Sequence, residues 1–161
     1  MDYYIYVLKN FANFKGRARR AEYWWFVLIN ILVGLGISVL DILITASFGL
    51  VLHLSTIYYL AILLPGAAVT VRRLHDLNAS GWWFVGLVLF SMVTWVLAMG
   101  ALFGLAFAPA GFAFEWFLGL FVVGQVLGLI FVFFMCRRGT RGENRFGPDP
   151  LAEDDQRKIE S

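Results

Sequence analysis

Four long apolar runs dominate the chain, at about residues 23–47, 52–71, 82–103 and 115–136. A helix that crosses the hydrocarbon core of a bilayer needs about 20 predominantly apolar residues, and each run meets that length. Because 60% of the 161 residues are hydrophobic and only 15% are charged, little sequence remains for a water-soluble core. The sequence therefore predicts an all-α, polytopic membrane protein with four transmembrane helices.

The spans consume most of the chain, so we expect one transmembrane domain over residues 1–161 that ends in a cytoplasmic tail at 137–161. Apolar residues before the first span recur at helical spacing, which predicts a short N-terminal helix lying in the membrane interface. These residues are Tyr4, Val7, Leu8, Phe11 and Phe14. A helix packed on the protein's own cytoplasmic loops explains the same spacing, and the pattern leaves both readings open.

The 13 lysines and arginines fall into three clusters, and the connections after the first and third spans contain none. The clusters are Lys9, Lys15, Arg17, Arg19 and Arg20; Arg72 and Arg73; and Arg137, Arg138, Arg141, Arg145, Arg157 and Lys158. Cations near the ends of spans are retained on the cytoplasmic side during insertion. This pattern predicts that both termini and the loop at 72–81 are cytoplasmic, and that the connection around 108–111 is not.

Tryptophans mark the same side of the predicted bilayer. Trp24 and Trp25 stand where the first span begins, and Trp82 and Trp83 stand where the third begins. Tryptophan is enriched at head-group depth in membrane proteins, so we expect these four rings to act as interface anchors.

The loop sequence "RRLHDLNASGWW" predicts a compact turn. If the second helix continues through it, Arg72 and Arg73 lie four and three residues before Asp76 and can pair with its carboxylate. Asn78 tolerates the left-handed conformation that ends a helix.

Three segments, "FKGRARRAEYWWF", "RRLHDLNASGWW" and "GENRFGPDP", resemble the signature segments of the DUF805 family of small bacterial inner-membrane proteins, which have no established biochemical role. The resemblance implies a location in the bacterial inner (plasma) membrane and assigns no reaction. The matching positions are Gly16, Arg17, Arg20, Glu22, Trp24, Arg72, Arg73, His75, Asp76, Ser80, Gly81, Trp82, Asn144, Arg145, Gly147, Asp149 and Pro150. Arg19, Asn78 and Phe146 depart from the residues that are common in the family.

The predicted topology brings all three segments to the cytoplasmic face, where their cations can surround one anionic group. The candidate ligands are Arg17, Arg20, Arg72, Arg73, His75, Arg138, Arg141 and Arg145, with Glu22, Asp76 and Asn144 as orienting residues. Guanidinium groups suit phosphate, so the leading hypothesis is a site for a phospholipid or polyprenyl-phosphate head group. The alternative is that these cations only set topology and attract anionic lipid, at about 1 kcal/mol each.

Enzyme signatures are missing from the sequence: it contains no HExxH motif, P-loop or nucleophile elbow, and Cys136 is the single cysteine. We therefore expect no metal and no cofactor, and a non-enzymatic membrane module that binds anionic lipid or a protein partner. A homo-oligomer or a membrane-protein partner fits this expectation, and nucleic acid does not. Two alternatives stay open: a small transporter or channel component, and an enzyme that acts on a lipid phosphate through His75 and Asp76.

Overall fold

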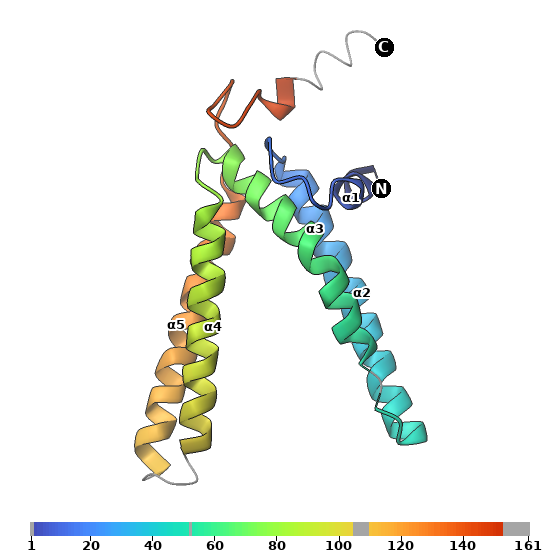
Figure 1. Ribbon diagram of the computed structural model, residues 1–161, viewed down its shortest axis with the longest axis vertical. Coiled ribbons are helices and arrows are strands. Elements are labelled where there is room, and N and C mark those ends of the chain that lie inside the picture. The colour runs from blue at the N-terminus through green and yellow to red at the C-terminus, as the bar shows by residue number, and fades with distance from the viewer. Residues whose placement is uncertain (1, 52, 105–109, 153–161) are drawn as a thin grey trace. The chain divides into compact units, whose positions relative to one another are not determined.

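The computed structural model describes residues 2–51, 53–104 and 110–152, which form five helices and no strand. The helices are α1 (Asp2–Lys9), α2 (Arg20–Phe48), α3 (Leu54–Asp76), α4 (Trp82–Gly104) and α5 (Ala110–Cys136) (Figure 1). Residues 108–109 of the predicted connection around 108–111, and the end of the chain at 153–161, lie outside the described residues.

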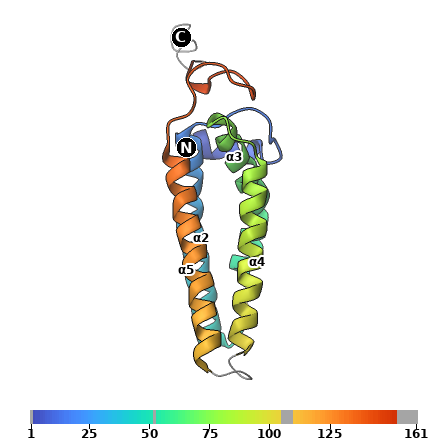
Figure 2. The same ribbon diagram turned by 90° about the vertical axis from the view of Figure 1, so that its left-hand side faces the viewer.

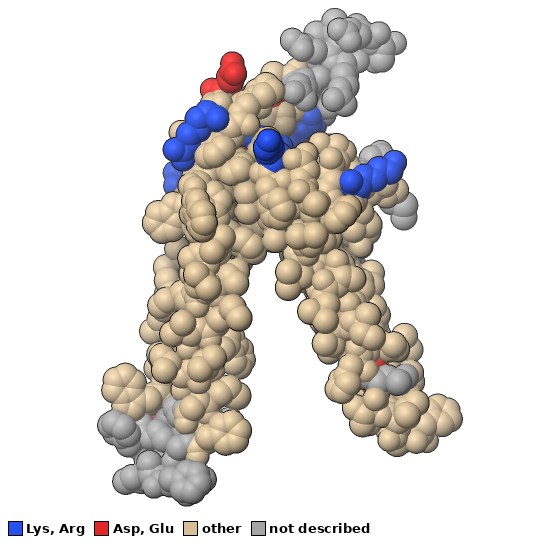
Figure 3. Space-filling model, in the orientation of Figure 1, with Lys and Arg blue, Asp and Glu red and all other residues tan. Residues whose placement is uncertain are grey.

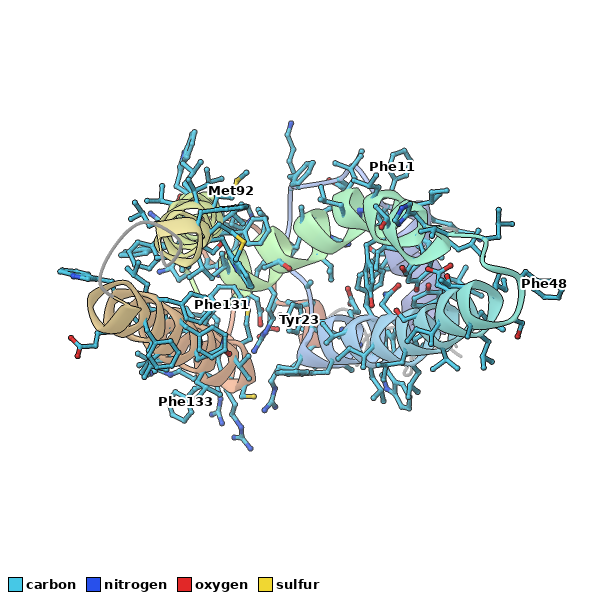
Figure 4. All side chains as sticks on the ribbon, turned by 90° about the horizontal axis from the view of Figure 1, so that it is seen from below. Phe11, Tyr23, Phe48, Met92, Phe131 and Phe133 are labelled. Carbon is cyan, nitrogen blue, oxygen red and sulfur yellow. The ribbon has the colours of Figure 1, made fainter. Side chains whose placement is uncertain are left out.

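The predicted all-α membrane fold is confirmed, because α2, α3, α4 and α5 are each long and apolar enough to cross a bilayer. Large apolar side chains project outward from these helices, as Phe48 and Phe133 do in Figure 4. These two side chains are 80% and 72% exposed. A water-soluble monomer rarely exposes contiguous apolar surface on this scale. Hydrocarbon is the solvent that such a surface requires.

Two compact units make up the molecule, one of Met1–Ser80 with Arg138–Ser161 and one of Gly81–Arg137. In the first unit, α2 and α3 pair as a hairpin and α1 packs against both helices. In the second unit, α4 and α5 lie side by side as a second hairpin (Figure 2). The single domain expected over residues 1–161 stays a prediction.

The second transmembrane helix is longer than its apolar run, because α3 continues past residue 71 to Asp76. Arg73 pairs with Asp76 one turn later, which stabilises the last turn of the helix. Beyond it, Asn78 has a φ of 58°, so the left-handed conformation predicted for this residue is confirmed. The loop between the second and third spans is therefore shorter than the predicted interval of 72–81.

The N-terminal helix exists, but it ends at Lys9, so Phe11 and Phe14 lie beyond it. The ring of Tyr4 stacks on Phe26 of α2 with centroids 5.6 Å apart, and Val7 is fully buried. Helix α1 therefore packs on the transmembrane helices α2 and α3.

A carboxylate closes the far end of the α2–α3 hairpin. Asp41 of α2 accepts the backbone N–H groups of Leu54 and Ser55 at 3.2 and 2.9 Å, and the Ser55 hydroxyl at 2.7 Å. These N–H groups belong to the first turn of α3 and have no partner within the helix. Asp41 therefore ties the end of α2 to the start of α3.

Asn30 is a buried polar residue that connects three helices. Its Oδ1 accepts the hydroxyl of Tyr58 of α3 at 2.6 Å and that of Tyr4 of α1 at 3.4 Å, while its Nδ2 donates to the Phe26 carbonyl. A polar atom surrounded by hydrocarbon needs such partners, since no water competes for them. Asn30 thereby fixes how α1 and α3 sit on α2.

We expect Tyr58→Phe to lower the free energy of unfolding by about 1 kcal/mol, because it removes a short hydrogen bond within the transmembrane region. Tyr59→Phe is the matched control, because the Tyr59 ring packs against Tyr58 but its hydroxyl makes no hydrogen bond to a described residue. Reversible unfolding in detergent micelles measures both variants. Equal stability of the two would contradict the connecting role of Asn30.

Candidate anion-binding site

One buried carboxylate, that of Asp76, holds two arginines. Its Oδ1 lies 3.0 Å from Nε and 2.8 Å from Nη2 of Arg17, and its Oδ2 accepts Nη1 of Arg73. Asp76 and Arg73 are 5% and 0% exposed. Charges that leave water need partners of opposite sign with good hydrogen-bond geometry, and this trio supplies them. We call Arg17, Arg73 and Asp76 the Asp76 junction.

The segment after α5 packs onto this junction. The backbone N–H and hydroxyl of Thr140 donate to the Asp76 carbonyl at 2.9 and 3.1 Å. In return, Arg17 donates to the carbonyl of Thr140 at 2.5 Å and to that of Gly142 at 2.6 Å. The Asp76 junction thus joins three parts of the chain that are far apart in sequence: the link before α2, the end of α3 and the segment after residue 138.

His75 contacts the third signature segment, "GENRFGPDP", and this contact also joins parts of the chain that are far apart in sequence. The imidazole of His75 stacks on the Phe146 ring with centroids 3.9 Å apart and planes 5° apart. Asn144 Nδ2 donates to the His75 carbonyl at 3.0 Å, and His75 Nδ1 lies 3.1 Å from the Gly16 carbonyl oxygen. Phe146 therefore contributes to this contact through its ring.

An open cavity of about 530 Å³ lies beside the Asp76 junction, and its lining is strongly basic. We call it the arginine cavity; its charged lining residues are Arg19, Arg20, Arg73, Arg138 and Arg141, with Asp76 and Asp149. Within the first unit, the blue Lys and Arg side chains gather where α2 begins and α3 ends, and the hairpin beyond is almost entirely tan (Figure 3). The cavity is therefore built at the basic end of the α2–α3 hairpin.

Three of the cavity's arginines make no hydrogen bond or ion pair with acceptors in the part of the chain that the structure describes. Arg20, Arg138 and Arg141 are exposed, and no hydrogen bond or ion pair joins them to any described residue. The other two are engaged: Arg73 by Asp76, and Arg19 by the Pro150 carbonyl. The unengaged guanidinium groups are the ones that a bound anion can recruit.

Arg19 is a lining residue that sequence reasoning missed. It stands at the N-cap of α2, with its Nε 4.0 Å from Glu22 Oε1. The Glu22 carboxylate in turn accepts the backbone N–H of Arg19, as in a capping box. The sequence feature that could have identified Arg19 is its position as the last residue before the first transmembrane helix. Its departure from the common family pattern obscured that signal.

The eight cations predicted to share one anion do not all reach the arginine cavity. Arg20, Arg73, Arg138 and Arg141 line it. The other four cations make contacts elsewhere; they are Arg17, Arg72, His75 and Arg145. Arg145 donates to the Asn78 carbonyl at 3.0 Å and lies over the Phe146 ring, at 4.6 Å from its centroid.

Arg72 is buried, with 2% of its surface exposed. Its guanidinium lies 5.7 Å from the centroid of the Tyr6 ring of α1. Its Nε and Nη2, and Oε2 of the neighbouring Glu22, have no hydrogen-bond partner among the described residues. Arg72 and Glu22 attract each other through space. Arg72 therefore contributes to the packing of α1 on the hairpin and not to the cavity surface.

The predicted orienting residues act in three different ways. Asp76 holds two arginines directly, and Glu22 attracts Arg19 and Arg72. Asn144 shapes the loop instead, because its Oδ1 accepts the Phe146 N–H at 2.9 Å and its Nδ2 donates to Thr140 and His75.

Of the tryptophans predicted as interface anchors, Trp82 and Trp83 begin α4, and Trp24 and Trp25 lie in the second turn of α2. Trp25, Trp82 and Trp83 are 53%, 77% and 72% exposed, whereas Trp24 packs edge to face on Tyr23. Their depth in a membrane stays a prediction.

Asp149 closes the loop that carries Arg141 over the cavity. Its Oδ1 accepts the Leu151 N–H at 3.0 Å and its Oδ2 accepts the Gly142 N–H at 2.9 Å. Because these bonds favour the ionised carboxylate, they hold the pKa of Asp149 below its usual value, and the charges of Arg17 and Arg19 act in the same direction. The loop is thus stabilised by an ionised side chain.

Comparison with known proteins agrees with this membrane architecture. The family model described as "Protein of unknown function (DUF805)" matches residues 11–148. Inner membrane protein YhaH of Escherichia coli (strain K12) is 37% identical over 157 residues, 95% of this chain and 99% of the relative. Inner membrane protein YhaI of the same strain is 38% identical over 150 residues, 93% and 96% of the two chains. No solved structure matches the chain significantly.

We expect Gly139→Ala to loosen the Asp76 junction, because a Cβ at this position would collide with both oxygens and Cγ of the Asp76 carboxylate. The carboxylate cannot move aside without losing its contact with Arg17 or Arg73. We therefore expect the free energy of unfolding to fall by about 1–3 kcal/mol. Gly36→Ala is the control, because nothing lies within 4 Å of a Cβ there. Unfolding in detergent compares the two variants, and an unaffected Gly139→Ala protein would show that the close approach does not matter.

The bonds to Asp149 predict a pH dependence of the loop. A carboxyl whose folded pKa is depressed stabilises the fold at pH values above its unfolded pKa, about 3.9, and loses that contribution as the pH falls through the folded pKa. Amide exchange protection at Gly142 and Leu151 should therefore be lost only under strongly acidic conditions. Asp149→Asn should remove it at neutral pH, whereas Glu143→Gln in the same loop should not. Amide exchange protection that changes neither with pH nor in Asp149→Asn would contradict this account.

Proposed function

The chain belongs to the DUF805 family, as its three signature segments predict, and we propose that its arginine cavity holds the anionic head group of a membrane lipid. It is an integral membrane protein, like the inner membrane proteins that it resembles. The names of these relatives state no activity, so the proposal depends on the geometry of this chain.

The observation that carries the proposal is the trio of Arg20, Arg138 and Arg141, which line one cavity without protein acceptors among the described residues. Like-charged side chains repel each other, so an anion that bridges them relieves that repulsion as well as accepting hydrogen bonds. Guanidinium groups offer paired N–H donors that match phosphate oxygens. The proposed site contains fewer cations than the eight expected from the sequence.

The frame around the trio also supports binding. Asp76 pairs with Arg17 and Arg73 and fixes the segment that bears Arg138 and Arg141 against the end of α3. A preorganised site avoids the loss of side-chain and loop freedom that weakens binding to mobile groups.

We also propose that this end of the molecule faces the cytoplasm, with both termini on that side. The cations of the α2–α3 unit stand where α2 begins and α3 ends, and the connection between the two helices at residues 49–53 has none. Retention of cations on the cytoplasmic side favours this orientation.

The lipid proposal is tested by native mass spectrometry of the purified chain titrated with phosphatidylglycerol. Arg138→Gln with Arg141→Gln should weaken binding by about tenfold or more, since each contact with an anionic lipid contributes about 1 kcal/mol. Lys9→Gln with Lys15→Gln is the charge-matched control, because these exposed cations lie outside the cavity. Equal binding by the two double variants would mean that general attraction to lipid explains the arginines.

The orientation is tested by placing reporters at two points of the chain. A reporter fused after residue 161 should be active only in its cytoplasmic form, and one inserted at 108–111 only in its periplasmic form. The opposite pattern at 108–111 would reverse the proposed topology and place the arginine cavity on the outer side.

A further inference from the structure

The charge balance of the arginine cavity defines the class of ligand more narrowly than a lipid head group in general. Five arginines and two aspartates line it, so five positive charges against two negative ones leave a formal charge of +3. Beyond the lining, Arg17 on Asp76 and Arg72 beside Glu22 contribute two positive charges, and Glu22 contributes one negative charge, so the balance stays positive. An anion that neutralises the cavity must carry more than one charge.

The spread of the unengaged arginines leads to the same conclusion. Arg20 begins α2, whereas Arg138 and Arg141 are carried by the segment after α5, so the three guanidinium groups approach the cavity from two different parts of the chain. A phosphodiester offers one charge and two free oxygens. A diphosphate ester carries about three charges near neutral pH, because its terminal phosphate loses a second proton near pH 6. Its free oxygens can engage all three arginines together.

The volume of the cavity permits such a ligand. About 530 Å³ falls within the range of clefts that enclose small molecules and exceeds what one phosphate group requires. The first turn of α2 borders this space through Arg19, Arg20 and Ala21, and the positive end of its helix dipole adds to the attraction for phosphate.

The surface of α2 provides a path for an apolar tail. Arg20, Trp24 and Leu28 follow each other at intervals of four residues, so they lie on one face of the helix. Leu28 is 47% exposed and lies in the span that crosses the membrane. A diphosphate held at Arg20 can therefore extend an attached chain past Trp24 into hydrocarbon.

We infer that the arginine cavity binds a lipid-linked diphosphate, such as a prenyl diphosphate, in preference to a lipid with a single phosphate. This inference rests on the proposed function and specifies its ligand class. The two phosphates engage Arg20, Arg138 and Arg141, and the apolar chain lies along α2.

The test uses the full chain in detergent and native mass spectrometry with three probes: farnesyl diphosphate, farnesyl monophosphate and phosphatidylglycerol. Farnesyl diphosphate should bind at least about tenfold more tightly than farnesyl monophosphate. Arg138→Gln with Arg141→Gln should abolish this preference, and Lys9→Gln with Lys15→Gln should retain it. Circular dichroism and gel filtration establish that the variants, whose changed side chains are exposed, remain folded.

Each other outcome overturns a defined part of the account. If the Arg138 and Arg141 changes weaken all three lipids equally and the wild type shows no preference for diphosphate, the inference is wrong and the proposed function stands. If these changes leave binding of every probe unaffected, both are wrong. Inorganic pyrophosphate serves as a competitor: competition at the same concentration as farnesyl diphosphate would identify a soluble diphosphate as the ligand and overturn the role of the lipid chain.

Discussion

The buried carboxylate of Asp76 is the interaction on which the basic end of this protein depends. It accepts hydrogen bonds from Arg17, 59 residues earlier in the chain, and from Arg73 one turn before it in α3. Neither arginine can be buried without an anion, and the anion cannot be buried without donors. The Asp76 junction is therefore formed as a unit, and it fixes the link before α2 and the segment after residue 138 to the end of α3.

This junction divides the arginines into two groups with different roles. Arg17 and Arg73 pair with Asp76 and serve the fold, and Arg17 also donates to the carbonyls of Thr140 and Gly142. Arg20, Arg138 and Arg141 are held near this frame but not neutralised by it. A protein that needed arginines only to set its topology would not have to assemble such a frame. The proposed phosphate site depends on this frame.

The sequence predicted the parts of this structure that depend on local properties. Apolar length determines the four spans, and the preference of Asn78 for positive φ determines where α3 is followed by a turn. The pairing of Arg73 with Asp76 was also predicted, because residues three apart along a helix are close in any fold, but the pairing predicted for Arg72 does not form. The end of α1 at Lys9 was not foreseen, because Phe11 and Phe14 continue the apolar spacing beyond the helix.

The contacts that the sequence could not predict join distant segments. Nothing in the residues around Arg17 reveals that it reaches Asp76 and the segment after α5, and nothing around Asn30 reveals its bonds to Tyr4 and Tyr58. Equivalent arginines in one sequence cluster thus acquire different roles only through tertiary contacts. The coarse prediction of an anion site at the signature segments could not separate them.

The most direct test of this account is hydrogen exchange in an Asp76→Asn protein, which keeps the shape of the side chain and removes its charge. Because breaking a buried ion pair costs about 3–5 kcal/mol, the backbone amides of Ala18 and Thr140 should lose protection together. The amide of Ser55, which Asp41 holds at the other end of the hairpin, should keep its protection. Full protection at both Ala18 and Thr140 in the variant would contradict the claim that the Asp76 carboxylate holds these segments in place.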